Sequence, residues 1–233
     1  MLSTMAELKI ISSSTCPFAQ RTRMVLLEKK VDFTLIEIPL DTKPDWFLKI
    51  SPYGKVPVVR HGDTVVFESS VINEYLEESF PERRLLPDDP SKRANARIWI
   101  DFDNTKFVPV FYKLLLAQES SLQKILVAQM TERLVFLDQE GFSSASKGPY
   151  WFGQKLSLVD LSLYPHFERF PVLTEYRGMN IPRSCRRLRA WLDVMRERSS
   201  AVVTAHESGF HIEAYIQYAN GTASGTTAKD MRI

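Results

Sequence analysis

The side chain best suited to covalent chemistry in this sequence is Cys16, which lies in the run STCPFAQR at residues 14–21. Pro17 suits the first position of a helix, where its missing N–H costs nothing. Cys16 would then lie at the helix N-terminus, where backbone N–H groups and the positive end of the helix dipole favour an anion. Cysteines placed in this way have pKa values lowered from ~8.5 to roughly 3.5–7.5, which predicts a reactive thiolate. A buried, inert cysteine is the alternative interpretation of this motif alone.

The other residues that could do chemistry form no recognisable site. Cys185 precedes an arginine-rich run without a proline or cap signal, so we interpret it as structural. Ala19 stands where a dithiol redox motif has its second thiol, so a redox cycle at Cys16 would need a thiol from outside the protein. The histidines are spread out, without metal-ligand spacing or an obvious carboxylate partner. We therefore predict no metal, and the lack of a glycine-rich phosphate loop predicts no nucleotide cofactor.

Composition is typical of an ordinary folded protein of one or two domains. The chain has 233 residues, of which 44% are hydrophobic, and a formal net charge of +2. Nothing in this balance indicates nucleic acid or a membrane surface as a partner, and the six arginines within 183–198 are interpreted as a solvated helix face. No run approaches the about 18 apolar residues of a membrane-spanning helix, and no signal peptide is recognisable. We expect a cytoplasmic protein.

The first 80 residues alternate strand-like and helix-like patterns. Strands are predicted at residues 8–11, 33–38, 56–59 and 65–67, and helices at residues 17–30, 45–50 and from 69 onward. The order βαβ-α-ββ-α predicts an α/β domain over residues 1–80.

The chain changes character after residue 80. Three prolines within 81–90 predict a linker. Residues 91–220 carry helical spacing and predict an all-helical domain, with one long segment bent or interrupted at Pro109. The pattern Ser157-x-x-Asp160 predicts a capped helix start. Residues 221–233 are rich in Gly, Ser, Thr and Ala, which predicts a flexible tail.

Several motifs in register resemble the glutathione transferases, and the omega class in particular. They are CPFAQRTR at 16–23, KPDWF at 43–47, GKVPV at 54–58, FESS at 67–70, LLPDDP at 85–90 and PHFER at 165–169. The first motif is also similar to those of the plant lambda and dehydroascorbate-reductase classes. The resemblance implies a thioredoxin-like N-terminal domain, a C-terminal helical bundle, glutathione as co-substrate and a homodimer.

The resemblance also implies the site residues: Cys16 as nucleophile, with Phe18, Lys43, Val56, Pro57, Glu68 and Ser69 binding glutathione. A cis Pro57 would turn the backbone of Val56 outward to pair with the cysteinyl part of the tripeptide. Ser69 and its helix N-terminus suit the γ-glutamyl carboxylate, and Glu68 suits the ammonium group. Lys43 would hold the glycine carboxylate, and Phe18 would pack beside the sulfur. The alternatives are a solvated turn lysine, a helix cap at Ser69 and a structural ion pair at Glu68.

Three functions are open at this point. The leading hypothesis is a glutathione-dependent thiol transferase and reductase, in which Cys16 forms a mixed disulfide with glutathione. The second is ordinary conjugation of glutathione to electrophiles, and the third is a non-enzymatic transferase-like protein that binds RNA polymerase or inserts into membranes. We predict that four residues of the helical domain form the wall of a second-substrate pocket: Phe107, Phe111, Tyr164 and Arg169.

Overall fold

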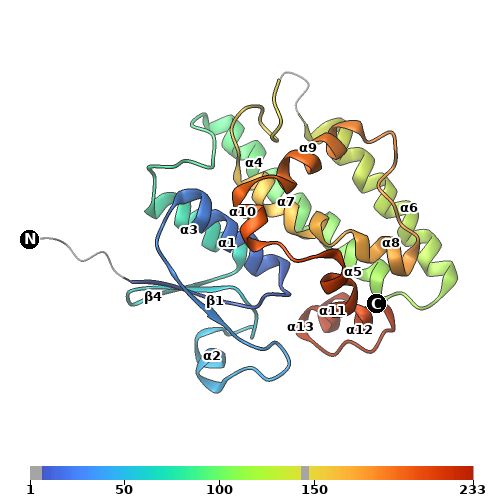
Figure 1. Ribbon diagram of the computed structural model, residues 1–233, viewed down its shortest axis with the longest axis horizontal. Coiled ribbons are helices and arrows are strands. Elements are labelled where there is room, and N and C mark those ends of the chain that lie inside the picture. The colour runs from blue at the N-terminus through green and yellow to red at the C-terminus, as the bar shows by residue number, and fades with distance from the viewer. Residues whose placement is uncertain (1–6, 143–146, 233) are drawn as a thin grey trace, which may run out of the picture. The chain divides into compact units, whose positions relative to one another are not determined.

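The computed structural model describes residues 7–142 and 147–232, and the chain divides into two compact units, Met1–Arg84 and Leu85–Ile233. The first unit follows the predicted order βαβ-α-ββ-α (Figure 1). Its elements are β1 (Leu8–Ser12), α1 (Pro17–Lys29), β2 (Thr34–Glu37), α2 (Asp45–Ile50), β3 (Val58–His61), β4 (Thr64–Phe67) and α3 (Ser69–Ser79). The predicted α/β class of this part of the chain is confirmed.

Four strands form one mixed sheet in the order β2-β1-β3-β4. β1 pairs in parallel with β2 and antiparallel with β3, and β3 pairs antiparallel with β4. The parallel pair needs a crossover, which α1 provides, and the antiparallel pair is joined by a short turn at Gly62, whose φ is +59°. Helices α1 and α3 pack together on one face of the sheet, and α2 lies on the other (Figure 1).

Polar residues, all buried except the partly buried Ser70, join α1 to α3. We call this set the polar seam: Arg21, Thr22 and Lys29 on α1, and Ser70, Asn73 and Glu77 on α3. The Thr22 hydroxyl donates to Asn73 Oδ1 at 3.0 Å, and Lys29 Nζ lies 2.6 Å from the Glu77 carboxylate. Residue numbers increase together along the seam, so the two helices are parallel and their N-termini lie at the same end.

The second unit is helical, as predicted. Its elements are α4 (Pro90–Phe102), η1 (Asp103–Phe107), α5 (Val108–Leu116), α6 (Ser120–Phe136), η2 (Leu137–Gly141), α7 (Leu158–Glu168), α8 (Pro171–Arg177), α9 (Arg186–Arg196), α10 (Ser199–Thr204), α11 (Ser208–Ala214), α12 (Ile216–Ala219) and α13 (Thr226–Met231). Across the described ranges 7–142 and 147–232, no helix has the length and apolar character needed to span a membrane.

Helix α7 is the most deeply buried element of this unit, since residues 158–167 are all buried. It begins with the predicted capping box between Ser157 and Asp160, which is confirmed. Asp160 also accepts hydrogen bonds from the backbone N–H of Trp151 and from the Trp191 indole, at 2.9 and 2.8 Å. One buried carboxylate therefore fixes the start of α7 to two neighbouring segments.

The long helical segment after residue 90 is interrupted earlier than predicted. The structure places a π-helical turn at Asp103–Phe107, before Pro109, and Pro109 lies in the first turn of α5. Pro109 has no N–H to donate to the preceding turn. The wider π-helical turn therefore forms where an α-helix would need that hydrogen bond.

The predicted linker 81–90 does not extend to residue 90. Leu85 and Leu86 are buried, and the Leu85 carbonyl accepts a hydrogen bond from the Leu158 N–H at 2.9 Å. Residues 85–90 therefore belong to the helical unit, and Pro90 opens α4. The proline content of this stretch could not show that Leu85 and Leu86 are buried in the helical unit.

The predicted flexible tail is wrong for residues 221–232. Thr226–Met231 form α13, whose Ala228 is fully buried in a small apolar cluster with Leu116 and Ala223. Arg232 donates to the backbone carbonyls of this segment. Small residues suggested disorder, but alanine at these positions allows close packing against α5. Residue 233 lies outside the described residues.

Candidate active site

Cys16 lies where the sequence predicted, at the N-cap of α1. Its backbone is extended, with φ −84° and ψ 116°, and Pro17 is the first helical residue. The Cys16 N–H donates to the Ser13 carbonyl at 3.1 Å, which closes the turn between β1 and α1. The side chain is 9% exposed, and its sulfur donates to the Val56 carbonyl at 3.6 Å. The thiol at the N-terminus of α1 therefore faces the backbone of a second loop, residues 51–57 between α2 and β3.

That second loop is held by its own hydrogen bonds. The buried Ser51 hydroxyl accepts from the Lys55 N–H at 3.0 Å and donates to the Lys55 carbonyl at 2.9 Å. The next peptide, Val56–Pro57, is cis, as the resemblance implied. These features place the main chain of Val56 beside Cys16.

Lys43 reaches this loop at Gly54. Gly54 has φ +59°, and a Cβ atom built there would lie 3.8 Å from Lys43 Nζ. The Lys43 ammonium group therefore lies beside Gly54, which precedes Val56 by two residues. The positive φ explains why glycine is needed at this position.

Phe18 packs against the apolar cluster that contains Cys16. The cluster also holds the side chains of Ala19 and Val56, and Phe67 at the end of β4 packs against it. The packing of Phe18 beside the sulfur of bound glutathione remains a prediction. The Phe18 ring is also covered by the guanidinium of Arg21, 5.0 Å from the ring centroid.

Glu68 and Ser69 follow Phe67 directly and begin α3. Glu68 has φ +69°, an unfavourable value for a residue with a Cβ, and such strain is concentrated at functional sites. The structure makes Glu68 the N-cap and Ser69 the first helical residue, so the interpretation of Ser69 as the N-cap is wrong by one position. The Glu68 side chain is exposed and makes no cap hydrogen bond among the described residues. The Glu68 side chain therefore does not cap α3.

The α/β unit therefore brings the predicted glutathione residues to one end of α1 and α3. Both helix N-termini carry partial positive charge, which favours a thiolate at one and a carboxylate at the other. Between them lies the main chain of Val56, whose N–H and C=O suit pairing with an extended peptide. This combination suits a small acidic peptide that carries a thiol.

The four predicted pocket residues in the helical unit are all buried. Phe107 stacks on Phe167 with ring centroids 5.0 Å apart, and Phe111 packs edge-on to Tyr112 at 5.4 Å. Burial raises the pKa of Tyr164 to about 12, with the Glu168 charge adding to the effect. The Arg169 guanidinium donates to the Pro165 carbonyl at 2.8 Å. Their role as a pocket wall remains a prediction.

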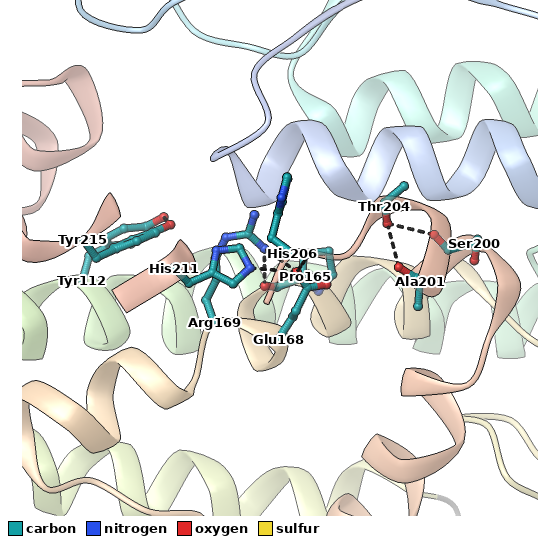
Figure 2. Close-up of polar contacts among 10 residues, drawn as sticks. All are labelled: Tyr112, Pro165, Glu168, Arg169, Ser200, Ala201, Thr204, His206, His211 and Tyr215. Carbon is teal, nitrogen blue, oxygen red and sulfur yellow. Dashed lines mark hydrogen bonds and ion pairs between the residues drawn. The ribbon is translucent and has the colours of Figure 1, made fainter. Parts of the chain in front are cut away.

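A buried polar cluster around Glu168 was missed in the sequence (Figure 2). Glu168 Oε1 lies 2.8 Å from His211 Nε2 and accepts from the His206 backbone N–H at 3.3 Å, with Arg169 at 4.0 Å. The expectation that the histidines lack a carboxylate partner is therefore wrong for His211. No local spacing could reveal this pair, because its members are on α7 and α11, far apart in sequence.

Within residues 7–142 and 147–232, no three His, Cys, Asp or Glu side chains come together in an arrangement that could hold a metal ion.

Comparisons with known proteins agree with this arrangement. Residues 15–79 match the family model of the glutathione S-transferase N-terminal domain, and residues 127–193 match that of the C-terminal domain. A relative named glutathione S-transferase omega-1, from Sus scrofa, is 32% identical over 167 residues, which cover 71% of this chain and 68% of the relative. The chain belongs to the glutathione S-transferase family.

Its relatives place this glutathione S-transferase near the omega class. A probable glutathione S-transferase from Oryza sativa subsp. japonica, named DHAR1, cytosolic, is 32% identical over 81% of this chain and 83% of its own. The crystal structure of glutathione transferase Omega 3C from Trametes versicolor superimposes with a TM-score of 0.82 at 30% identity, covering 92% of this chain and 91% of that one. The resemblance seen in the motifs is confirmed, and the protein is an omega-like enzyme.

Proposed function

We propose that this glutathione S-transferase acts as a thiol transferase and glutathione-dependent reductase, with Cys16 as its nucleophile. The observation that carries the proposal is the placement of Cys16 at the N-terminus of α1, with its sulfur facing the Val56 carbonyl at 3.6 Å. A serine or tyrosine hydroxyl can only hold the thiolate of glutathione, whereas a cysteine can also bond to its sulfur.

The reaction would proceed by two thiol–disulfide exchanges. The Cys16 thiolate attacks the glutathionyl sulfur of a mixed disulfide, which forms a Cys16–glutathione disulfide and releases the substrate as a thiolate. The thiolate of a second glutathione then attacks the glutathionyl sulfur held by Cys16. Glutathione disulfide leaves, and the Cys16 thiolate is regenerated. Ala19 in place of a second cysteine is the reason why the resolving thiol comes from glutathione.

Glutathione would lie across the N-termini of α1 and α3. Its sulfur would lie at Cys16 beside Phe18, and its cysteinyl backbone would pair with Val56 next to the cis Pro57. The γ-glutamyl carboxylate would accept from Ser69 and the first N–H groups of α3, with its ammonium group at Glu68. Lys43 would meet the glycine carboxylate. The strained backbone of Glu68 supports this assignment.

The names of the relatives support oxidised small molecules as the second substrate. Omega and DHAR relatives are both represented, and the latter abbreviation denotes dehydroascorbate reductase. We therefore include dehydroascorbate among the proposed substrates. The family resemblance adds small mixed disulfides and S-glutathionyl ketones.

A homodimer in the cytoplasm remains part of the proposal. The relatives include proteins named cytosolic and chloroplastic, and one solved structure is described as a trimeric glutathione transferase. Light scattering on the purified protein would measure the assembly directly. A mass of twice 26.8 kDa is expected.

Removing the side chains of Glu68 and Ser69 should weaken glutathione binding more than it weakens folding. Loss of one charge-assisted hydrogen bond costs roughly 1.5–3 kcal/mol, which is about ten- to hundredfold in affinity. Titration calorimetry of Glu68→Ala and Ser69→Ala, each with a thermal melt, would measure both effects.

The matched control lies at the other end of α3. Glu78 and Ser79 repeat the same pair of residue types, and both are exposed. Their alanine variants should bind glutathione as the wild type does. If Glu68→Ala and Ser69→Ala also bind normally, these residues serve only the local structure of the helix start.

A further inference from the structure

We infer that Arg21 is a positioning residue of the glutathione site, which fixes the N-terminus of α3 relative to that of α1. This inference rests on the proposed function, because it assigns a role in aligning two parts of the same site. Arg21 itself would touch neither glutathione nor the reacting sulfur atoms.

Arg21 contacts both helices that form the site. Its guanidinium lies over the ring of Phe18, in the first turn of α1, at 5.0 Å from the centroid. Its NH1 donates to the Ser70 hydroxyl at 3.5 Å, and Ser70 follows Ser69 in the first turn of α3. The side chain is fully buried. One planar group therefore bridges the residue beside the catalytic thiol and the helix end proposed for the γ-glutamyl carboxylate.

Burial makes this bridge unusual for an arginine. A guanidinium taken out of water is costly unless its surroundings compensate the charge, and arginine is almost never fully buried without such compensation. An arginine that served only solubility would lie on the surface. The fixed fork of the guanidinium can stack on a ring and donate sideways at the same time, which an ammonium group cannot do in the same geometry.

The polar seam also provides a comparison for Arg21. Lys29 lies at its other end, two helical turns along α1, where it pairs with Glu77 and donates to the carbonyls of Phe80 and Arg83. Both cations are buried and both join α1 to α3, but only Arg21 adjoins the helix N-termini. If the seam merely holds the helices together, both cations should affect glutathione binding equally. If Arg21 aligns the site, only the loss of Arg21 should weaken glutathione binding.

The experiment measures kcat and KM for glutathione with the glutathione mixed disulfide of 2-mercaptoethanol, for wild type, Arg21→Met, Arg21→Lys and Lys29→Met. Misplacing the N-terminus of α3 should cost about one hydrogen bond to the charged γ-glutamyl carboxylate, so Arg21→Met should raise KM about tenfold. The kcat at saturating glutathione should change less than about threefold, because the chemistry stays at Cys16. Arg21→Lys should recover part of the loss, since it keeps the charge without the fork.

Two further measurements separate positioning from loss of structure. Alkylation of Cys16 by iodoacetamide does not use α3, so Arg21→Met should react within about twofold of wild type. Lys29→Met should lower the melting temperature at least as much as Arg21→Met, yet keep KM within about twofold. If Arg21→Met fails to fold, Ser70→Ala removes the acceptor of the hydrogen bond while the Arg21 side chain stays in place, and it should raise KM about threefold.

An equal rise of KM in Lys29→Met, or an unchanged KM in Arg21→Met and Ser70→Ala, would overturn the positioning role and leave the proposed function intact. Failure of the proposed function looks different, because the wild type itself would then show no saturable dependence on glutathione. The inference would fall with it in that case.

Discussion

Replacing Cys16 with serine is expected to abolish the reduction of mixed disulfides while leaving glutathione binding in place. Serine is similar in size to cysteine and keeps a hydrogen-bonding group at the N-terminus of α1. Its hydroxyl is not ionised near neutral pH and cannot form a disulfide with glutathione, so the first exchange step is lost. We expect turnover to fall by about three orders of magnitude or more.

The same variant should keep or gain a second activity. A serine hydroxyl can donate a hydrogen bond to the thiolate of bound glutathione, so conjugation to an aryl halide should persist or rise. Cys185→Ala is the matched control, because this second cysteine is buried at the start of α9 and burial raises the pKa of its thiol. It should reduce mixed disulfides normally. Full reductase activity in Cys16→Ser would show that Cys16 is not the nucleophile.

The largest effect on stability is expected for Asp160→Ala. The Asp160 carboxylate is fully buried and accepts from the Ser157 N–H and hydroxyl, at 2.8 and 2.7 Å, and from Trp151 and Trp191. Burial raises the pKa of this carboxyl, and the hydrogen bonds from the same partners act in the opposite direction. Removing it leaves several buried donors without an acceptor, at about 1–3 kcal/mol each. We expect a loss of about 4 kcal/mol or more in the free energy of unfolding.

Denaturant unfolding of Asp160→Ala beside Asp89→Ala would measure this loss. Asp89 is also an aspartate that caps a helix, since it accepts from the Lys92 N–H at 2.9 Å at the start of α4, but it is exposed. Its alanine variant should change the unfolding midpoint only slightly. Comparable midpoints for the two variants would contradict the central structural role given to the buried carboxylate.

Strong local patterns explain why much of the fold was predictable. A run of β-branched residues that includes Val58 and Val59 indicated a sheet strand, and Gly62 marked the hairpin turn. The capping box at Ser157 depends on a spacing of three residues and was visible in the same way. By contrast, α13 was missed because its stability comes from contacts with Leu116, more than a hundred residues earlier in the chain.

The candidate site was likewise predictable only where its sequence signals are local. Cys16 could be predicted because its signal, a proline at the first helical position, is local. The contact of its sulfur with the Val56 carbonyl depends on how two loops meet, and only the family resemblance suggested that meeting. Neither the bridge from Arg21 to Ser70 nor the pair of His211 with Glu168 leaves a trace in local spacing. Both require parts of the chain that only tertiary packing brings together.

The most direct test of the account is to trap the covalent intermediate on Cys16. Purified wild-type protein would be mixed with glutathione disulfide, quenched in acid and measured as intact mass, and the modified peptide would then be mapped. The account predicts one glutathionyl group per chain, located on Cys16, which disappears on addition of excess glutathione. No adduct, or an adduct on Cys185 alone, would contradict the mechanism.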